Sequence, residues 1–149
     1  MIRVQTEPFD ITTELTALRA AKPAIGATAI FVGSVREMSD GQKLESMTLE
    51  HYPGMTEQAL TDIEQEARKR WSVQDTVIIH RSGIMKPGED IVLVITTSAH
   101  REAAFAACEF LMDYLKTKAP FWKLEAGSGG SSWVDAKSSD DKAAARWKT

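Results

Sequence analysis

The sequence predicts an α+β fold with a mainly antiparallel sheet and two long amphipathic helices. Strand-like and helix-like segments mix without the regular strand–helix–strand period of a parallel α/β protein. Residues 55–71 and 99–117 repeat apolar side chains at helical spacing. The β-rich runs at 76–80 and 91–97 are separated by turn-forming residues 86–90, which favours a hairpin-like connection.

The first part of the chain is expected to hold a short strand, a helix and two longer strands. Residues 2–6 form the short strand, and Asp10 or Thr12 can cap the helix that follows. Residues 26–35 are rich in β-branched and aromatic side chains, and Gly33 among them suggests a bulge or a close backbone approach. Residues 44–52 form a further strand, although neither of its faces is cleanly apolar.

The chain changes character toward its end. Polar residues 36–43 are expected to form a loop, and residues 121–125 form a last strand after the long second helix. The Gly-Ser-rich sequence from residue 127 is typical of a linker, and the residues after it are polar. We therefore expect a single domain over residues 1–125. Residues 126–149 form a flexible polar tail, or one that orders only on a ligand or partner.

Length and composition restrict the class of protein. A chain of 149 residues with 43% hydrophobic and 26% charged residues is typical of one soluble globular domain. Its pI of 5.6 argues against general nucleic-acid binding, which needs a basic face. The single cysteine excludes an internal disulfide. There is no signal-peptide pattern and no apolar run near the roughly 20 residues of a membrane helix, so we expect a cytoplasmic protein.

Positive charge gathers at two places in this acidic chain. The eleven residues that end at Lys123 contain three lysines and one acid. His100 and Arg101 lie at the expected start of a helix, where acidic side chains are more usual. A helix start with this pair fits a phosphate or carboxylate ligand, because arginine supplies a fork that matches their oxygens. Solvated side chains, or pairing with acids, are an equal alternative.

Single basic residues differ in how strongly they indicate a functional site. Lys116 and Lys118 lie near a helix end, where cations complement the helix dipole. Lys123 follows two aromatic residues, where a partly desolvated amine would suit proton transfer or covalent chemistry. Arg36 lies where a strand meets a loop, a usual place for ligand contacts, with a solvated arginine as the alternative. Site and surface roles remain open for His51, Tyr52, His80 and Arg81.

Other catalytic patterns are absent from the sequence. Cys108 falls on the apolar stripe of the second long helix, so it is expected to be a packing residue and not a nucleophile. Three histidines and this one cysteine do not form a zinc pattern. The sequence has no phosphate loop, dinucleotide motif or nucleophile elbow. We therefore expect neither a metal nor a cofactor.

Five motifs, in this order and spacing, resemble the large, catalytic subunit of molybdopterin synthase. The resemblance covers residues 26–125. The motifs are Phe-Val-Gly-Ser-Val-Arg36, Leu-Glu-His-Tyr-Pro-Gly-Met55, His-Arg-Ser-Gly83 with Pro-Gly-Glu89, Ser-Ala-His-Arg101, and Met-Asp-Tyr-Leu-Lys116 with Ala-Pro-Phe-Trp-Lys123.

The resemblance implies a fold, an assembly and an activity. The fold is α+β of the α/β-hammerhead kind, in a homodimer that binds a small ubiquitin-like sulfur-carrier subunit at each end to give a heterotetramer. The activity is sulfur transfer from the C-terminal Gly-Gly thiocarboxylate of that carrier to cyclic pyranopterin monophosphate, which yields molybdopterin for molybdenum cofactor biosynthesis. Because the sulfur arrives on the carrier, the chain needs no cysteine nucleophile.

The resemblance also implies roles for single residues. Lys116 and Lys123 match the essential lysines, which would transfer protons and stabilise anionic intermediates. Arg36, His100 and Arg101 match residues of the anion pocket, which would draw on both subunits of the dimer.

The resemblance implies different roles for Lys137 and Lys118. Lys137 matches a basic tail residue that would also bind substrate, whereas Lys118 matches a peripheral position. The alternative function is a non-enzymatic module that binds phosphate or a carrier protein, in which the lysines only hold anions.

Overall fold

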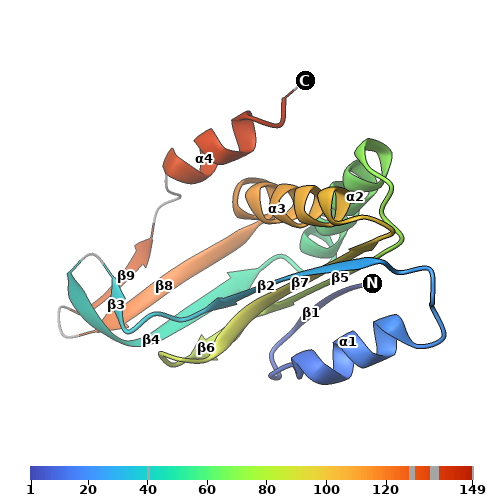
Figure 1. Cartoon of the computed structure of the whole chain (residues 1–149). Helices are drawn as coiled ribbons and strands as arrows, with labels where there is room; N and C mark the ends of the chain where they lie inside the picture. Colours follow the sequence, from blue (N-terminus) through green and yellow to red (C-terminus); the bar gives the residue numbers. More distant parts are fainter. Residues whose placement is uncertain (40, 128–129, 135–137, 149) are drawn as a thin grey trace.

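Two β-sheets and the helices packed on them form the fold (Figure 1). The computed structural model describes residues 1–39, 41–127, 130–134 and 138–148. The predicted α+β class with mainly antiparallel sheets is confirmed. Within this part of the chain, no helix has the length and the apolar character needed to span a membrane.

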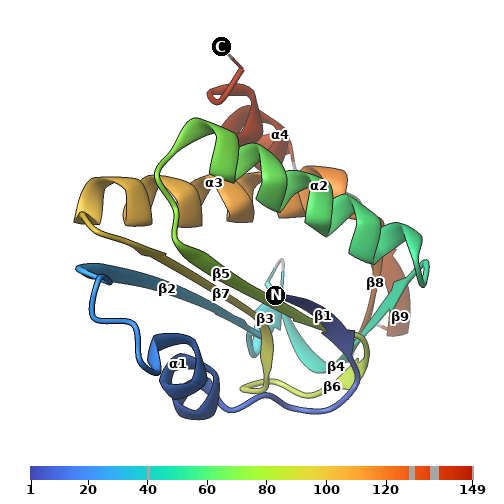
Figure 2. The same ribbon diagram turned by 90° about the vertical axis from the view of Figure 1, so that its right-hand side faces the viewer.

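The first sheet has the strand order β1-β5-β7-β2. Its strands are β1 (Ile2–Gln5), β5 (Asp75–Arg81), β7 (Asp90–Ser98) and β2 (Ala27–Ser34). β1 pairs in parallel with β5, and the other two pairs are antiparallel. The central strands β5 and β7 are buried over most of their length, because helices cover both faces of the sheet (Figure 2).

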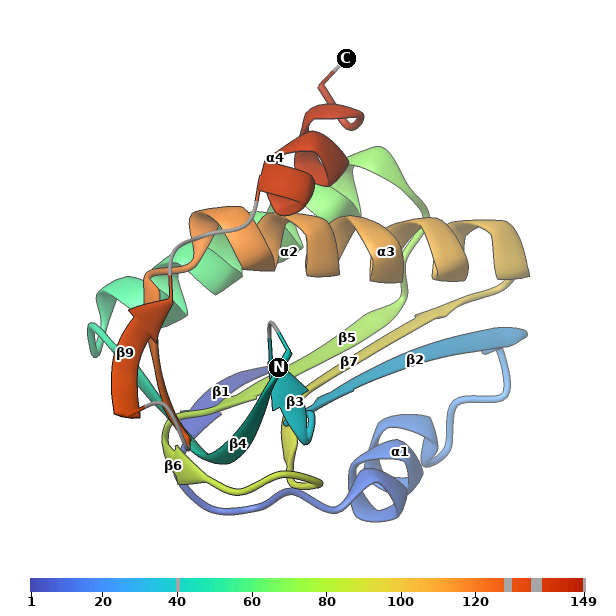
Figure 3. The same ribbon diagram turned by 90° about the vertical axis from the view of Figure 1, so that its left-hand side faces the viewer.

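The second sheet lies beside one end of the first (Figure 3). Its strands, in spatial order, are β3 (Met38–Ser39), β4 (Gln42–His51), β8 (Phe121–Gly127) and β9 (Gly130–Val134). A short strand, β6 (Gly83–Met85), also pairs with β4. Each of these pairs is antiparallel.

The described residues form the helices α1 (Ile11–Arg19), α2 (Met55–Arg70), α3 (Arg101–Lys118) and α4 (Ser138–Ala145). α2 and α3, the two long amphipathic helices that the sequence predicts, lie on one face of the first sheet, and α1 covers the other (Figure 2). Of the two residues expected to cap α1, Asp10 does so: its carboxylate accepts a hydrogen bond from the Thr13 N–H at 2.8 Å.

Alternating side chains of the central strands fill two layers of core. Ile78 and Val94 point toward α2 and α3, where they join a cluster that includes Leu60 and Phe110. The intervening residues point toward α1 and pack on its apolar side. They are Val77, Ile79, Leu93 and Ile95.

Two expectations about single segments are wrong. The expected loop at residues 36–43 contains β3, which forms a hairpin with β4 through Gly41 at a φ of 79°. The Gly-Ser stretch expected to be a linker contains β9, which pairs with β8. Both strands are short and form hairpins with a neighbouring strand, and their polar or Gly-Ser-rich composition does not indicate a strand. The helix α4 also forms within the polar segment that ends the chain.

A bulge explains why β4 lacks a clean apolar face in the sequence. Leu44 is buried before the register shift, whereas Met47 and Leu49 are buried after it. The extra residue changes the inward-facing positions from even to odd numbers. Gly33 lies at a second bulge, as expected, and a side chain there would come within 2.7 Å of Val92.

The two sheets meet where His80 of β5 stacks on Phe121 of β8. His80 is 5% exposed, and the ring centroids are 3.8 Å apart. Its Nδ1 lies 2.8 Å from the Arg81 carbonyl oxygen, so Nδ1 carries the proton and Nε2 is left as an acceptor. Burial lowers the pKa of His80 to about 4, against the opposing effect of this hydrogen bond, and the positive charge of Lys116 adds to the lowering. The ring is therefore neutral at physiological pH.

Ile78→Ala tests the core of the first sheet. Ile78 is 1% exposed, so the substitution is expected to lower the free energy of unfolding by about 2–5 kcal/mol. The matched control is Ile84→Ala, at a position that is 73% exposed, where we expect a change within about 0.5 kcal/mol. Urea unfolding at one fixed protein concentration measures both values. Equal losses for the two variants would contradict this core.

The buried His80 ring predicts a loss of stability in acid. Below pH 6.5 the ring is protonated in the unfolded chain but not in the folded protein until the pH approaches 4, so protons favour unfolding across that interval. The free energy of unfolding should fall by up to about 3 kcal/mol between these limits on account of His80. In His80→Asn, which keeps a hydrogen-bond donor but does not titrate, urea unfolding at pH 6.5 and 4.5 should show a smaller loss. A loss as large as that of the wild type would show that His80 is not its source.

Candidate active site

A cavity of about 330 Å³ lies where the two sheets meet the carboxyl end of α3. Its walls come from β2, β4, β7 and β8, and from the last turn of α3 with the residue that follows it. This volume is at the lower end of the range for small-molecule sites. The apolar part of the wall is formed by side chains of both sheets, which include Phe31, Met47, Leu49, Ile91 and Phe121.

Three predicted site residues line this one cavity: Arg36, Lys116 and Lys123. Each comes from a different element. Arg36 is the second residue after β2, Lys116 lies in the last turn of α3, and Lys123 lies on β8. Lys123 is opposite Leu49 in the register of β4 and β8, so both side chains share the face of the second sheet that borders the cavity.

Two acidic residues also line the cavity, and sequence reasoning missed both. Glu125 lies two residues after Lys123 on the same face of β8, with 4.0 Å between Lys123 Nζ and Glu125 Oε2. Asp140 comes from α4, within the segment that was expected to be a polar tail. The strand alternation from Lys123 could have indicated Glu125. Local sequence held no signal for Asp140, because its place depends on how α4 packs.

Contacts at the end of the chain hold α4 against α3 (Figure 3). The Arg146 guanidinium donates to Asp113 Oδ2 at 2.7 Å and also pairs with Glu109. The Trp147 indole N–H donates to the same Asp113 oxygen at 2.6 Å. The Trp147 ring packs edge-on against Phe110 and a neighbouring tryptophan. These contacts bring Asp140 to the cavity rim.

His80 lines the cavity and was left undecided in the sequence. Its neutral ring presents an acceptor nitrogen rather than a charge, since Nδ1 is committed to the Arg81 carbonyl. A histidine at the end of an otherwise apolar central strand is a signal that could have identified it, because such a residue is buried and must be hydrogen-bonded.

His100 and Arg101 do not line this cavity in the single chain. Both are exposed at the amino end of α3, with His100 in the N-cap position and without a side-chain cap hydrogen bond. Fifteen residues of helix separate Arg101 from Lys116, or about 22 Å. One chain therefore brings together Arg36, Lys116 and Lys123, but not the basic pair at the helix start.

The remaining candidate residues lie elsewhere. Lys118 borders a separate groove between α2 and α3, next to Phe110 and Tyr114. Cys108 is buried, and burial raises the pKa of its thiol to about 11, so it is a protonated packing residue as expected. Lys137 falls outside the described residues. Among the residues that the structure describes, no group of three His, Cys, Asp or Glu side chains is placed to hold a metal ion.

Comparison with known proteins gives consistent matches over nearly the whole chain. A molybdopterin synthase catalytic subunit from Ralstonia nicotianae is 54% identical over 146 residues, which cover 98% of this chain and 83% of that protein. The structure of a molybdopterin biosynthesis MoaE protein from Burkholderia ambifaria is 54% identical and superimposes with a TM-score of 0.86, covering 100% of this chain and 98% of that one.

A more distant structure shares the fold alone. It is a protein–protein complex of subunits 1 and 2 of the molybdopterin-converting factor from Helicobacter pylori. The match has a TM-score of 0.75 at 19% identity and covers 91% of each chain.

The family model for MoaE proteins matches residues 4–118, which include Arg36, His80, His100, Arg101 and Lys116. Lys123 and the acidic residues of the cavity lie beyond the matched range but within the stretch covered by the full-length relatives. The chain therefore belongs to the MoaE family and is a molybdopterin synthase catalytic subunit of molybdenum cofactor biosynthesis.

Proposed function

We propose that the cavity is the place where sulfur passes from the C-terminal thiocarboxylate of a small sulfur-carrier subunit to cyclic pyranopterin monophosphate. The observation that carries this proposal is the meeting of Arg36, Lys116 and Lys123 on one cavity of about 330 Å³. The substrate is a phosphate ester, and three cations on a partly apolar wall suit an anion attached to a flat ring.

Lys116 and Lys123 are the proposed catalytic residues. Each transfer breaks the bond between sulfur and the acyl carbon of the carrier and forms a bond between sulfur and a carbon of the substrate, which gives up its bond to an oxygen atom. Water takes the place of sulfur on the carrier, which leaves as a carboxylate, so the exchange involves no oxidant. Anionic intermediates arise on this path, and two ammonium groups can stabilise them and supply protons. Glu125, 4.0 Å from Lys123 Nζ, is placed to orient that lysine.

The basic pair at the start of α3 reaches the site through a dimer in this proposal. β2 is at the edge of the first sheet, and Ile30 and Phe31 at its middle are 42% and 40% exposed. Its first residue pairs with Ser98, two positions before His100, and its last lies two positions before Arg36. Two such edges related by a twofold axis run antiparallel, so the start of one strand lies beside the end of the other. His100 and Arg101 of the partner subunit would then approach the cavity.

The complete assembly adds one carrier to each cavity and is a heterotetramer in the cytoplasm. An extended carrier tail that ends in two glycines can enter a narrow cavity, because recognition of such a tail relies on backbone partners and not on side-chain volume. Lys137 remains a proposed substrate contact. The similar fold of a two-subunit complex from Helicobacter pylori agrees with binding of a second, small subunit.

Substitution of the two lysines tests the reaction. Lys116→Ala and Lys123→Ala should each lower the turnover of cyclic pyranopterin monophosphate at least about 100-fold, because each removes a charge that acts on the intermediates. The assay mixes the protein with thiocarboxylated carrier and substrate and detects molybdopterin by its fluorescent oxidation product. Lys118→Ala is the matched control, since Lys118 borders a different groove, and should keep near-wild-type turnover.

The outcome also separates the enzyme from a module that only binds anions. Near-wild-type turnover in both lysine variants would contradict the assignment of these residues. A stable complex with the carrier, without sulfur transfer even in the wild-type protein, would favour the non-enzymatic alternative.

Mixed dimers test whether the site spans two subunits. Arg101→Ala and Lys123→Ala should each inactivate the pure dimer. When the two variants are co-expressed, half of the dimers are mixed and each mixed dimer has one intact site, so about a quarter of wild-type activity should return. Activity that stays at the level of the single variants would show that Arg101 and Lys123 do not act across the dimer.

A further inference from the structure

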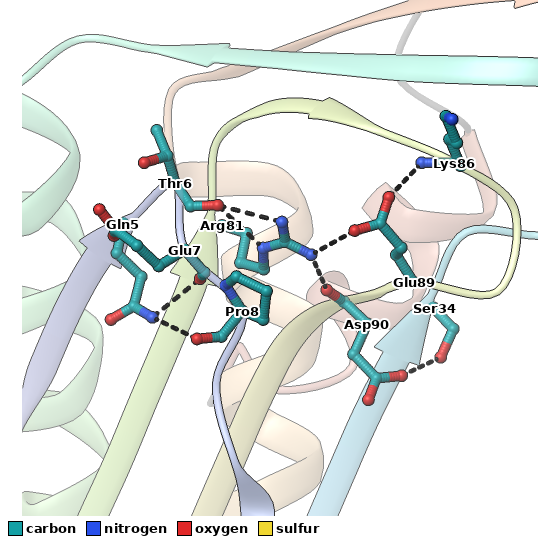
Figure 4. A network of polar contacts seen from close by, with 9 residues as sticks. All are labelled: Gln5, Thr6, Glu7, Pro8, Ser34, Arg81, Lys86, Glu89 and Asp90. Carbon is teal, nitrogen blue, oxygen red and sulfur yellow. Dashed lines mark hydrogen bonds and ion pairs between the residues drawn. The ribbon is translucent and has the colours of Figure 1, made fainter.

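Arg81 is a buried cation at the point where β5 leaves the first sheet (Figure 4). It is 5% exposed, and its guanidinium donates hydrogen bonds in three directions. Nε and Nη2 donate to the carbonyl oxygen of Thr6 at 3.2 and 3.0 Å. Nη1 donates to Glu89 Oε1 at 3.3 Å and to the carbonyl oxygen of Asp90 at 3.1 Å. Arg81 thus ties the end of β1 to the start of β7.

The Glu89 carboxylate fixes the turn between β6 and β7 (Figure 4). Oε1 accepts from Arg81, and Oε2 accepts from the backbone N–H of Lys86 at 2.6 Å. The hydrogen bond from Lys86 has the largest effect, and together these bonds lower the pKa of Glu89. The carboxylate is therefore charged at neutral pH. The side chain is 39% exposed, so it adds little to stability as an ion pair, and its effect is on the position of the turn.

The same turn holds the end of β2 through its main chain. The carbonyl oxygen of Glu89 accepts from the Val35 N–H at 2.9 Å, and the Gly88 N–H donates to the Val35 carbonyl at 2.8 Å. Next to this pair, the Ser34 hydroxyl donates to Asp90 Oδ1 at 2.7 Å. Val35 is 4% exposed and packs in the core of the second sheet. The residue that follows it is Arg36, which lines the cavity.

Two motifs of the sequence with no assigned role are thereby joined. His-Arg-Ser-Gly83 supplies Arg81, and Pro-Gly-Glu89 supplies its acidic partner together with the backbone that pairs with Val35. We propose that the Arg81–Glu89 ion pair is a positioning device for Arg36, which acts through the turn and Val35 to direct the guanidinium of Arg36 at the substrate anion. This inference rests on the proposed function for the assignment of Arg36 to that anion.

A double-mutant cycle on Glu89 and Arg36 tests the coupling. Glu89→Ala should raise the KM for cyclic pyranopterin monophosphate about tenfold and change kcat less than about twofold, because a binding contact is displaced while the lysines stay in place. Arg36→Ala should raise KM by a similar factor. Adding Glu89→Ala to Arg36→Ala should then change KM less than about twofold, since Glu89 has no contact left to position.

Two further variants separate positioning from general damage. Glu89→Gln keeps one acceptor oxygen for only one of the two donors, Arg81 Nη1 and the Lys86 N–H, and loses the negative charge, so its KM should lie between those of the wild type and Glu89→Ala. Glu14→Ala is the matched control, because Glu14 of α1 forms an ion pair with Arg3 of β1 and is not among the residues that line the cavity. Its KM should equal that of the wild type.

Each outcome decides the proposal. Multiplicative effects of Glu89→Ala and Arg36→Ala would show that Glu89 acts on the fold and would overturn it. An unchanged KM in Arg36→Ala would remove Arg36 from the substrate and overturn it as well. If the wild-type protein has no turnover, the proposed function fails. Hydrogen exchange of the Val35 amide then tests whether the Arg81–Glu89 pair holds the segment that precedes Arg36. Exchange about tenfold faster in Glu89→Ala, but not in Glu14→Ala, supports the device, and unchanged exchange overturns it.

Discussion

The junction of the two sheets at the end of β5 is the constraint on which the site depends. Consecutive strand residues point to opposite sides, so His80 faces Phe121 and the cavity while Arg81 faces Thr6 and Glu89. The two neighbouring residues His80 and Arg81 therefore make the contacts on both sides of the junction. Polar groups can be buried here because they have hydrogen-bond partners. The His80 ring is neutral and its Nδ1 is bonded to a carbonyl, and the Arg81 guanidinium donates to two carbonyls and a carboxylate.

The cavity gathers charges that repel each other before any ligand arrives. Arg36, Lys116 and Lys123 come from a strand end, a helix end and a second strand, so no single element has to carry all three. Glu125 and Asp140 line the same cavity and place two acidic side chains among the three basic ones. In the proposed function, an anionic substrate replaces solvent around cations that the fold already holds in place, which is the preorganisation that electrostatic catalysis needs.

Local signals in the sequence predicted α1, α2, α3 and most strands, but not α4 or the contacts between distant segments. The cap at Asp10 and the apolar stripe of α3 depend on neighbours within a few residues, and both are found in the structure. The cations of the cavity were identified through the resemblance to family motifs, because spacing alone did not separate site residues from surface residues. The pairing of Arg81 with Thr6 and the place of Asp140 depend on partners far along the chain. In β4, the bulge interrupts the alternation of buried and exposed residues, so the apolar face of this strand is not apparent in the sequence.

The edge strand β2 has a consequence for how the protein is made and handled. Its sequence, Ala-Thr-Ala-Ile-Phe-Val-Gly-Ser, contains no charge and no proline, which are the devices that usually keep an exposed edge from adding further strands. A short, uncharged, β-prone segment of this kind is also a seed for fibrils when it is left uncovered. A chain whose β2 edge is left uncovered is therefore open to aggregation through this edge.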